Sequence, residues 1–403
     1  MKILFLTDEF HPNFGANSLL VRTLAGEFIK NEHQVFVMPF SYGNDVSALE
    51  IWQGIQIVRT IPNDDKMSLV NNLKKGHFLT AFKIAWKYAQ QRCVKKEKIL
   101  CKDRISARSV LEAFIKENEI DAVISICCSI ELSFPLLYLR KKKQLPCKWI
   151  FYMLDPFESH SYYRGIDREK RLRKIQHDIM KHCDSIVMTG LIYHDTTAWE
   201  TEEILTKISV VEFPKIERPI VQPCDDDILL DKEKINVICT GSKNEAVRNS
   251  AYTLRMCEQL QDANVVFHFI GYGWSTMDKE IRGNCVFYKP RSHQAIRNLQ
   301  MQADFLLNIG NVVVNQLPSK VLEYISTGKP IINVVKSKDC PTIELLESAD
   351  SMTVFESENL ETAIVKMKGF IFAQHKENAF SEIEKQYKIY TPKYVAEQFL
   401  IGW

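Results

Sequence analysis

The chain has 403 residues, of which 46% are hydrophobic and 25% are charged, and its formal net charge is +2 at pH 7. The length predicts about two or three domains, and the composition is typical of a soluble globular protein with a sizeable core. The nearly balanced charge gives no whole-chain signal of a nucleic-acid partner. The sequence has no apolar run of about 18 residues, so it predicts no membrane-spanning helix.

The start of the chain and its cysteines both favour the cytoplasm. The first apolar run, residues 3–6, is short and is soon followed by Asp8 and Glu9, which is unlike a secretory signal. The 11 cysteines are an odd number and include no C-x-x-C pair. That usage is typical of reduced, buried thiols rather than of disulfides, so we expect a cytoplasmic protein without a metal site.

Short apolar runs alternate with helical patterns along the chain. Runs this apolar indicate strands covered on both faces, as in parallel sheets, and the alternation predicts βαβ units. The predicted strands of the first half are 3–7, 34–39, 55–59, 122–126, 149–154, 185–188 and 208–213. Those of the second half are 236–240, 265–270, 285–288, 305–309 and 330–334. Residues 214–227 hold three prolines and three consecutive aspartates between the two series, so we place a domain boundary there.

The first candidate site is the loop at residues 8–18, between the first predicted strand and a predicted helix at 19–30. Gly15 in this loop would let the backbone approach a phosphate or a sugar closely. An ordinary strand-to-helix turn is the alternative interpretation. The loop lacks the G-x-G-x-x-G spacing, which argues against a nicotinamide-dependent enzyme.

Residues 66–108 form a basic segment whose only acids are Glu97 and Asp103. Aromatic and apolar residues are interleaved with the lysines and arginines, and residues 140–143 add a second basic cluster. Such a stretch is typical of a segment that docks on an anionic membrane surface. A solvated helix face is the alternative interpretation. RNA binding is disfavoured because the charge is local and no recognition motif accompanies it.

Residues 151–160 follow a buried strand of the first half and should therefore face a cleft between domains. Asp155 stands at the strand end, with His160 five residues later. Asp155 can orient an acceptor hydroxyl or act as a base. Alternatively, Asp155 and Pro156 simply begin a helix, as an N-cap followed by a proline in the first turn.

Residues 240–249 follow the first predicted strand of the second half and contain Ser242, Lys243 and Arg248. A guanidinium can bind phosphate oxygens through two parallel hydrogen bonds, and Lys243 would add a second cation. Fixed cations of this kind can stabilise negative charge on a bound phosphate group. A solvated charge on a helix is the alternative.

Residues 315–332 read as a loop, a helix of about three turns and a buried strand. Pro318 and Ser319 are typical of a helix start, and Gly328 is typical of its end. Free N–H groups at a helix start can bind a diphosphate. Glu323, one turn further in, can accept hydrogen bonds from ribose hydroxyls.

This segment resembles the nucleotide-sugar-binding signature of family 4 glycosyltransferases of the GT-B fold. Residues 318–332 match its variant P-S-K-x-x-E-Y-x-x-x-G-K-P-I-I. The resemblance covers nearly the whole chain and implies an α/β protein with two doubly wound Rossmann-like domains facing a cleft. It implies an N-terminal acceptor-binding domain at 1–215 and a nucleotide-sugar-binding domain at 216–380. The last segment, 381–403, would be a helix, broken at Thr391-Pro392, that crosses back to the first domain.

The resemblance also assigns roles to single residues. Glu323 matches the second acid of the family's E-x7-E pattern, which grips the ribose, whereas Asn315 stands in place of the first acid. Ser242 stands at an arginine position, Arg248 at a lysine position, and Asp155 where many relatives have a histidine. Lys320 adds charge or is a surface lysine. The implied donor-binding residues are Gly15, Ser242, Asn315, Leu317, Pro318, Ser319, Lys320 and Glu323, and the implied catalytic residues are Arg248, Lys243 and Asp155.

The implied activity is that of a hexosyltransferase-like enzyme, which moves a sugar from a nucleoside diphosphate sugar to a glycan or lipid-linked glycan. The resemblance implies retention at the anomeric carbon, no metal or other cofactor, and a role in cell-surface polysaccharide or lipopolysaccharide biosynthesis. The protein would then work in the cytoplasm, on the inner face of the cytoplasmic membrane.

Two alternatives stay open. One is a nucleotide-sugar 2-epimerase on the same fold, which would convert the donor without an acceptor. The other is a non-catalytic sugar-nucleotide-binding partner subunit.

Overall fold

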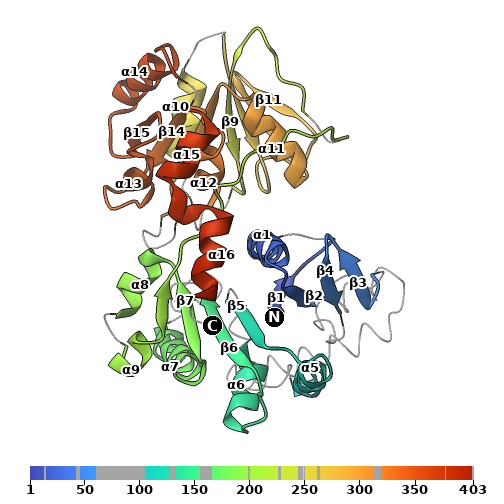
Figure 1. Ribbon diagram of the computed structural model, residues 1–403. Helices are drawn as coiled ribbons and strands as arrows, with labels where there is room; N and C mark the ends of the chain where they lie inside the picture. The colour runs from blue at the N-terminus through green and yellow to red at the C-terminus, as the bar shows by residue number, and fades with distance from the viewer. Residues whose placement is uncertain are drawn as a thin grey trace, which may run out of the picture. The chain divides into compact units, whose positions relative to one another are not determined.

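The computed structural model describes residues 1–12, 15–41, 46–59, 105–127, 133–154, 166–197, 200–225, 228–243, 248, 250–260, 264–312, 317, 319–376 and 378–401. They form two compact units (Figure 1), each described by itself below. The first unit comprises Met1–Glu212 and Val395–Trp403, and the second comprises Phe213–Tyr394.

The first unit is built on an eight-stranded sheet, in which β1 lies between β2 and β5. Neighbouring strands are parallel except for β3 and β4, which are antiparallel. Across the sheet the strands are β3 (Leu49–Trp52), β4 (Ile55–Val58), β2 (Gln34–Ser41), β1 (Lys2–Glu9), β5 (Ala122–Cys127), β6 (Lys148–Met153), β7 (Ser185–Met188) and β8 (Ile208–Val210).

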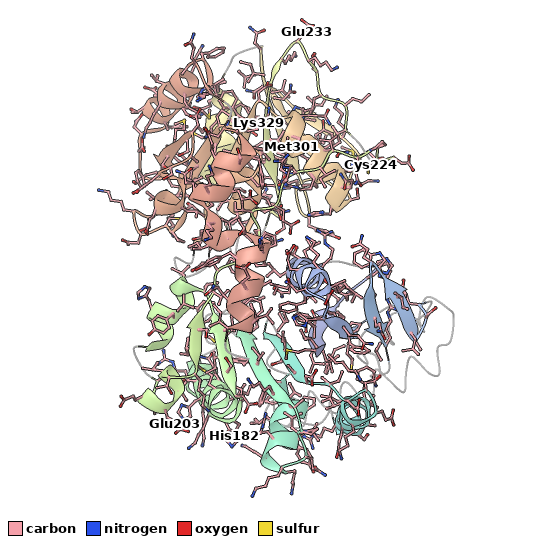
Figure 2. The ribbon with its side chains drawn as sticks, in the orientation of Figure 1. His182, Glu203, Cys224, Glu233, Met301 and Lys329 are labelled. Carbon is pink, nitrogen blue, oxygen red and sulfur yellow. The ribbon has the colours of Figure 1, made fainter. Side chains whose placement is uncertain are left out.

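Helices cover both faces of this sheet, which explains why its strands are apolar at successive positions. They are α1 (Ala16–Lys30), α5 (Ile105–Glu117), α6 (Phe134–Lys141), α7 (Ile166–His182), α8 (Gly190–Thr197) and α9 (Glu202–Leu205). Leu4 and Trp149 pack on one face in a core with residues of α5, α6 and α7. Phe5 points to the other face, where its ring stacks on Phe28 of α1. Helix α7 ends at His182, whose Nδ1 lies 2.7 Å from the carbonyl oxygen of Asp178 (Figure 2).

The end of the chain packs on the first unit. Thr391 interrupts the helical segment and Pro392 begins α16 (Pro392–Leu400), as the sequence predicts. Phe399 of α16 makes edge contacts with the rings of Phe28 and Tyr152, at centroid distances of 6.4 and 5.0 Å. The predicted return of the last helix to the first half of the chain is therefore confirmed.

The second unit is built on a seven-stranded sheet with the same winding. Neighbouring strands are parallel except for β11 and β12. Across the sheet the strands are β11 (Glu280–Arg282), β12 (Cys285–Tyr288), β10 (Val265–Ile270), β9 (Ile235–Thr240), β13 (Phe305–Ile309), β14 (Ile331–Val335) and β15 (Ser351–Phe355).

Helices again cover both faces. Val237 and Cys239 of β9 point to a core shared with α10 and α14, whereas Thr240 points to the opposite face and contacts α11 and α12. The helical segments are α10 (Ala251–Gln259), α11 (His293–Gln302), α12 (Ser319–Ile325), α13 (Thr342–Leu346), α14 (Leu360–Ile371), α15 (Phe380–Gln386) and the 3-10 turn η3 (Lys388–Tyr390).

Both sheets reverse their winding at a central strand. In the second unit, β9 is followed in sequence by β10 on one side, while β13 pairs with β9 on the other side. Ligands of doubly wound sheets bind at the carboxyl ends of the strands at such a reversal. The fold therefore points to the ends of β9 and β13 in the second unit, and of β1 and β5 in the first.

Each strand predicted from the sequence is present, but the one predicted at 208–213 ends three residues early, and three strands within the described residues were missed. The strand predicted to reach residue 213 stops at Val210, because the chain then turns and the Lys215 N–H donates to the Phe213 carbonyl at 2.9 Å. The missed strands are β3, β11 and β15, which all lie at sheet edges. Edge strands bury one face at most, so they lack the continuous apolar run on which the prediction depended.

Candidate functional site

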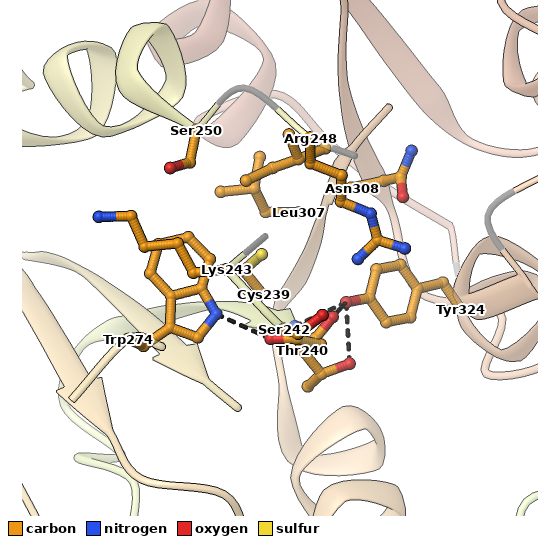
Figure 3. A pocket seen from close by; sticks show the side chains of 12 residues that line it. Cys239, Thr240, Ser242, Lys243, Arg248, Ser250, Trp274, Leu307, Asn308 and Tyr324 are labelled. Carbon is orange, nitrogen blue, oxygen red and sulfur yellow. Dashed lines mark hydrogen bonds between the residues drawn. The ribbon is translucent and has the colours of Figure 1, made fainter. Parts of the chain in front are cut away.

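A pocket lies at the carboxyl ends of β9 and β13, where the second sheet reverses its winding (Figure 3). Its empty volume is about 320 Å³, part of which is open to solvent. Among the described residues that line it, none is an aspartate or a glutamate. These residues are Cys239, Thr240, Gly241, Ser242, Lys243, Arg248, Ser250, Trp274, Leu307, Asn308, Ile309 and Tyr324.

Two glycines shape the floor of the pocket. Gly241 has φ of +123° and Gly271 has φ of +145°, in the region that favours glycine. A side chain at position 271 would collide with the Gly241 carbonyl. That carbonyl accepts a hydrogen bond from Trp274 Nε1 at 2.8 Å, drawn as a dashed line in Figure 3. The loops after β9 and β10 are thus held directly against each other.

Two predicted cations line this pocket. A Cβ added to Gly241 would lie 3.0 Å from Arg248 Nη1, so the glycine leaves room for the guanidinium. Arg248 Nε donates to Asn311 Oδ1 at 3.0 Å, which orients the group without neutralising it. Lys243 Nζ lies 5.8 Å from the centre of the Trp274 ring, and the Lys243 N–H donates to the Tyr272 carbonyl at 2.7 Å. The site is therefore positively charged and partly preorganised.

Tyr324 of α12 also lines the pocket. Its phenolic oxygen accepts the Thr240 N–H at 2.8 Å and lies 3.0 Å from Thr240 Oγ1, which also accepts from Gln300 Nε2 at 3.2 Å. Burial raises the pKa of Tyr324, so the phenol stays protonated and can donate in return. This network fixes Thr240, the last residue of β9, after which the loop with Lys243 and Arg248 (the cationic loop) begins.

Glu323 neighbours Tyr324 on α12 but does not line the pocket. It is 5% exposed, with Oε2 at 2.8 Å from Lys320 Nζ and Oε1 at 3.4 Å from Lys215 Nζ. Burial alone would raise the pKa of Glu323, but Lys320, Lys215 and Arg297 outweigh it and hold the pKa well below its usual range. Glu323 is therefore an ionised carboxylate beside the pocket.

The helix that carries Glu323 is shorter than predicted. It spans Ser319–Ile325 and not about three turns, although Gly328 has the expected left-handed conformation with φ of +75°. Ser326 Oγ donates to the Glu323 carbonyl at 2.7 Å, and Thr327 Oγ1 donates to the Tyr324 carbonyl at 2.6 Å. These side chains compete for carbonyls that a further helical turn would use, so the helix ends early.

The structure places some of the predicted site residues in or next to the pocket. Ser242, Lys243 and Arg248 line the pocket, and Leu317, Ser319, Lys320 and Glu323 lie in or just before α12. Asp155, Asn315 and Pro318 lie outside the described residues. Most of the basic segment 66–108 also lies outside them.

Gly15 lies in the first unit, where it is the N-cap residue of α1. Its N–H donates to Ser18 Oγ at 2.7 Å. The space that a side chain at 15 would fill is taken by the Glu9 carboxylate. A phosphate could approach as closely as the sequence predicts only after that carboxylate moved.

The loop after β1 contains a cluster that the sequence did not reveal. The side chain of Arg59 is 0% exposed and donates to the carbonyl of His11 at 2.6 Å and to Glu50 Oε2 at 2.7 Å. The His11 ring stacks on Trp52 with centroids 4.9 Å apart, and its Nδ1 lies 3.2 Å from Glu50 Oε1. Arg59 ends a predicted strand, and only the chain reversal through β3 brings Glu50 and Trp52 to it.

A polar ladder crosses three strands behind the pocket, and it was also missed. Asn308 Nδ2 donates to Asn333 Oδ1 at 2.8 Å, and Asn333 Nδ2 donates to Thr353 Oγ1 at 3.3 Å. Thr342 Oγ1 donates to the same Asn333 oxygen at 3.1 Å. The signal was a single asparagine inside each of two apolar strand sequences, since buried amides need such partners.

Among the described residues, no helix is both long and apolar enough to cross a membrane. In the second basic cluster, Arg140 pairs with Asp184 and Lys141 pairs with Asp178. Part of the charge expected at residues 140–143 is thus neutralised within the first unit.

No protein-family model and no curated protein matches the chain. Solved structures do match along its whole length. A lipopolysaccharide outer core galactosyltransferase, WaaB, is 16% identical with a TM-score of 0.58, covering 100% of this chain and 99% of that one. Sucrose-phosphate synthase from Thermosynechococcus elongatus is 10% identical with a TM-score of 0.65, covering 99% and 97%. TarM is 11% identical with a TM-score of 0.63, covering 100% and 98%. The chain therefore has the GT-B fold, as predicted.

Proposed function

We propose that this protein is a glycosyltransferase, which moves a sugar from a nucleoside diphosphate sugar to a glycan or lipid-linked glycan. One observation carries the proposal: Lys243 and Arg248 line one pocket where the second sheet reverses its winding, and no carboxylate is among the described residues that line it. This is where doubly wound sheets bind ligands, and the charge suits a diphosphate.

The chemistry requires the cations to act as the diphosphate leaves. Cleavage of the sugar–oxygen bond moves the bonding electrons to the diphosphate oxygen. Arg248, held by Asn311, would stabilise that oxygen through charge-assisted hydrogen bonds, and Lys243 would add a point charge. Because the Arg248 guanidinium is held before the reaction, little reorganisation of this group is needed in the transition state.

Glu323 would hold the nucleoside part of the donor. It is ionised and lies one residue from Tyr324, which lines the pocket. A carboxylate can accept hydrogen bonds from both hydroxyls of a ribose. Ser319 and Lys320 at the start of α12 would then lie along the donor, as the resemblance to family 4 implies.

The finer points of the proposal rest on that resemblance and on the names of similar structures. They are retention at the anomeric carbon, a reaction without a metal, and Asp155 as the group that orients the acceptor hydroxyl. WaaB is named as a galactosyltransferase of the lipopolysaccharide outer core, and WaaG as a glycosyltransferase of lipopolysaccharide biosynthesis. We propose a related cell-surface acceptor, used on the inner face of the cytoplasmic membrane with residues 66–108 docked on anionic lipid.

The first test is a thermal-shift screen of the protein with UDP-, GDP-, ADP- and CMP-linked sugars. A donor at about 100 times its Kd should stabilise the protein by about 2.7 kcal/mol. Arg248→Ala and Glu323→Ala should lose the shift, whereas Arg255→Ala, an exposed arginine on α10, should keep it. If none of the nucleotide sugars stabilises the wild type, the proposal is wrong.

The second test separates transfer from its alternatives. The donor that binds is incubated alone and with a panel of glycan and lipid-linked acceptors, and the products are identified by mass spectrometry and NMR. A glycosylated acceptor with the donor's anomeric configuration is expected. Conversion of the donor without acceptor would indicate an epimerase, and binding without any turnover would indicate a non-catalytic subunit.

A further inference from the structure

Lys215 is a buried lysine to which the proposed reaction gives no role. It lies in the segment after β8, at the beginning of the second unit, and is 8% exposed. Lysine is seldom this buried unless a partner compensates its charge. The side chain must therefore have a specific partner.

The backbone around Lys215 is fixed. The N–H groups of Lys215 and Ile216 both donate to the carbonyl of Tyr390, at 2.9 and 3.0 Å. Tyr390 ends η3, so the segment is tied to a helical turn distant in sequence. Since the main chain is held on this side, the side chain reaches α12 from a defined position.

The partner is Glu323. Lys215 Nζ lies 3.4 Å from Glu323 Oε1, and Lys320 Nζ lies 2.8 Å from Oε2. Arg297 of α11 is the third cation that faces this carboxylate, and its guanidinium donates to the Glu323 carbonyl oxygen at 3.1 Å. Among the described residues, the carboxylate oxygens thus have one ammonium partner each.

A diol matches the hydrogen-bonding capacity of that arrangement. A carboxylate offers about four lone-pair sites, two on each oxygen. Among the described residues each oxygen contacts one ammonium group, so each can accept one further hydrogen bond, which is what two neighbouring ribose hydroxyls require. With Lys215 absent, the described residues would leave one ammonium group, that of Lys320, on one carboxylate oxygen.

We propose that Lys215 is a positioning residue for the donor, which holds the Glu323 carboxylate so that both of its oxygens can accept hydrogen bonds from the ribose of a nucleoside diphosphate. The inference rests on the proposed function, because it assumes that Glu323 contacts the ribose. A lysine outside the pocket would then set how tightly the nucleoside binds without touching the donor. Its loss should raise the donor KM and leave kcat unchanged, since the ribose contact is the same in ground state and transition state.

The effect should depend on pH. In the wild type, three cations keep the pKa of Glu323 low, so its charge is constant from about pH 5 upward. Lys215→Met removes one of these cations while the carboxylate stays buried, so the pKa of Glu323 should rise. The carboxyl group would then protonate at a higher pH than in the wild type and, once protonated, could accept fewer hydrogen bonds.

The test is calorimetric titration of the full chain with UDP, GDP and ADP at pH 5, 6 and 7.5. For the diphosphate that binds the wild type, Kd should change less than about twofold over this range. Lys215→Met should bind about tenfold more weakly than the wild type at pH 7.5, and this difference should not narrow toward pH 5. Lys215→Arg should restore the wild-type profile, and Lys338→Met, at an exposed position, should match the wild type.

Two further variants keep the test decisive. Lys215→Gln removes the charge but keeps a donor, so it serves if the methionine variant does not fold. Glu323→Gln removes the carboxylate that Lys215 contacts, so Lys215→Met should not weaken diphosphate binding further in that variant. If the Lys215 variants lose thermal stability but bind the diphosphate like the wild type at every pH, Lys215 is only structural and the inference is wrong. If the wild type binds no diphosphate, the proposed function itself fails.

Discussion

The two sheets reverse their winding in the same way, yet the loops at the two reversal points carry opposite charge. After β9 the loop presents Lys243 and Arg248, and none of the described residues that line their pocket is acidic. At its end β1 presents Asp8 and Glu9, and His11 follows with Glu50 beside it. Arg59, the cation at this end of β1, is fully buried and already bound to Glu50 and to the His11 carbonyl.

The winding of each sheet determines where a binding site can lie, and the charge of the residues there determines which ligand the site can bind. A diphosphate suits the loop after β9 and would be repelled by the acids after β1. Carboxylates and an imidazole instead accept hydrogen bonds from neutral hydroxyls, which is what a glycan offers. We therefore propose that the second unit binds the donor and the first binds the acceptor, in keeping with the proposed transfer.

The largest effect is expected from Arg248→Ala, which removes the cation that distinguishes the second loop. The kcat/KM should fall by about 10²–10³-fold, the usual cost of losing one group that stabilises charge in a transition state. Arg248→Lys should recover only part of the activity because it cannot bind phosphate through two parallel bonds. Steady-state kinetics with the identified donor measure both, with Arg255→Ala as the matched control. Equal activity of Arg248→Ala and wild type would show that the charge of this loop is incidental.

Tyr324→Phe should have the next largest effect, because it removes a hydrogen bond to Thr240 and so lowers the stability of the protein where the cationic loop begins. The buried Thr240 N–H would lose its acceptor, which typically costs about 1–3 kcal/mol of stability. Chemical denaturation measures the loss, and Tyr272→Phe, at a residue 75% exposed, serves as the control. Unchanged stability would mean that the network does not support the loop.

Some features of both units could be predicted from the sequence. Apart from the edge strands β3, β11 and β15, the strands of both sheets were predictable because continuous apolar runs mark strands buried on both faces. The cations at 243 and 248 were predictable because a loop that follows a central strand must lie at the reversal point. The resemblance placed Glu323 on the same helix as Tyr324. Because the two residues are adjacent in the sequence, their nearness in space was also predictable.

The rest depended on contacts between distant segments. Lys215 and Glu323 are 108 residues apart, and Arg59 and His11 are 48 apart, so only the folded chain brings each pair together. Glu9 looked like an ordinary acid at a strand end, and nothing in its neighbours in sequence indicated that its carboxylate would fill the space beside Gly15. The short length of α12 likewise came from Ser326 and Thr327, whose hydroxyls could have pointed elsewhere.

A smaller effect, confined to the acceptor, is expected from Glu9→Gln. The change removes an acid at the end of β1 and should raise the acceptor KM about tenfold, the equivalent of about one good hydrogen bond. The donor KM should stay the same because the second unit is untouched. Kinetics with acceptor varied at saturating donor measure the first, and the reverse design measures the second. A rise in the donor KM alone would contradict the assignment of ligands to the two loops.

The smallest effect concerns stability against pH, where the two carboxylates should behave oppositely. Burial, assisted by Asp8, raises the pKa of Glu9 above its ordinary 4.5, so its contribution to stability is present below that pH and is lost as the pH rises through the folded value. The cations around Glu323 lower its pKa below 4.5, so its contribution is complete above that pH and is lost on further acidification.

Unfolding by urea from pH 3.5 to 7.5 should therefore show Glu9→Gln gaining stability relative to wild type toward neutral pH. Glu323→Gln should show its deficit at neutral pH and recover toward the wild type in acid. Parallel curves for all three proteins would mean that neither carboxylate feels the environment described for it.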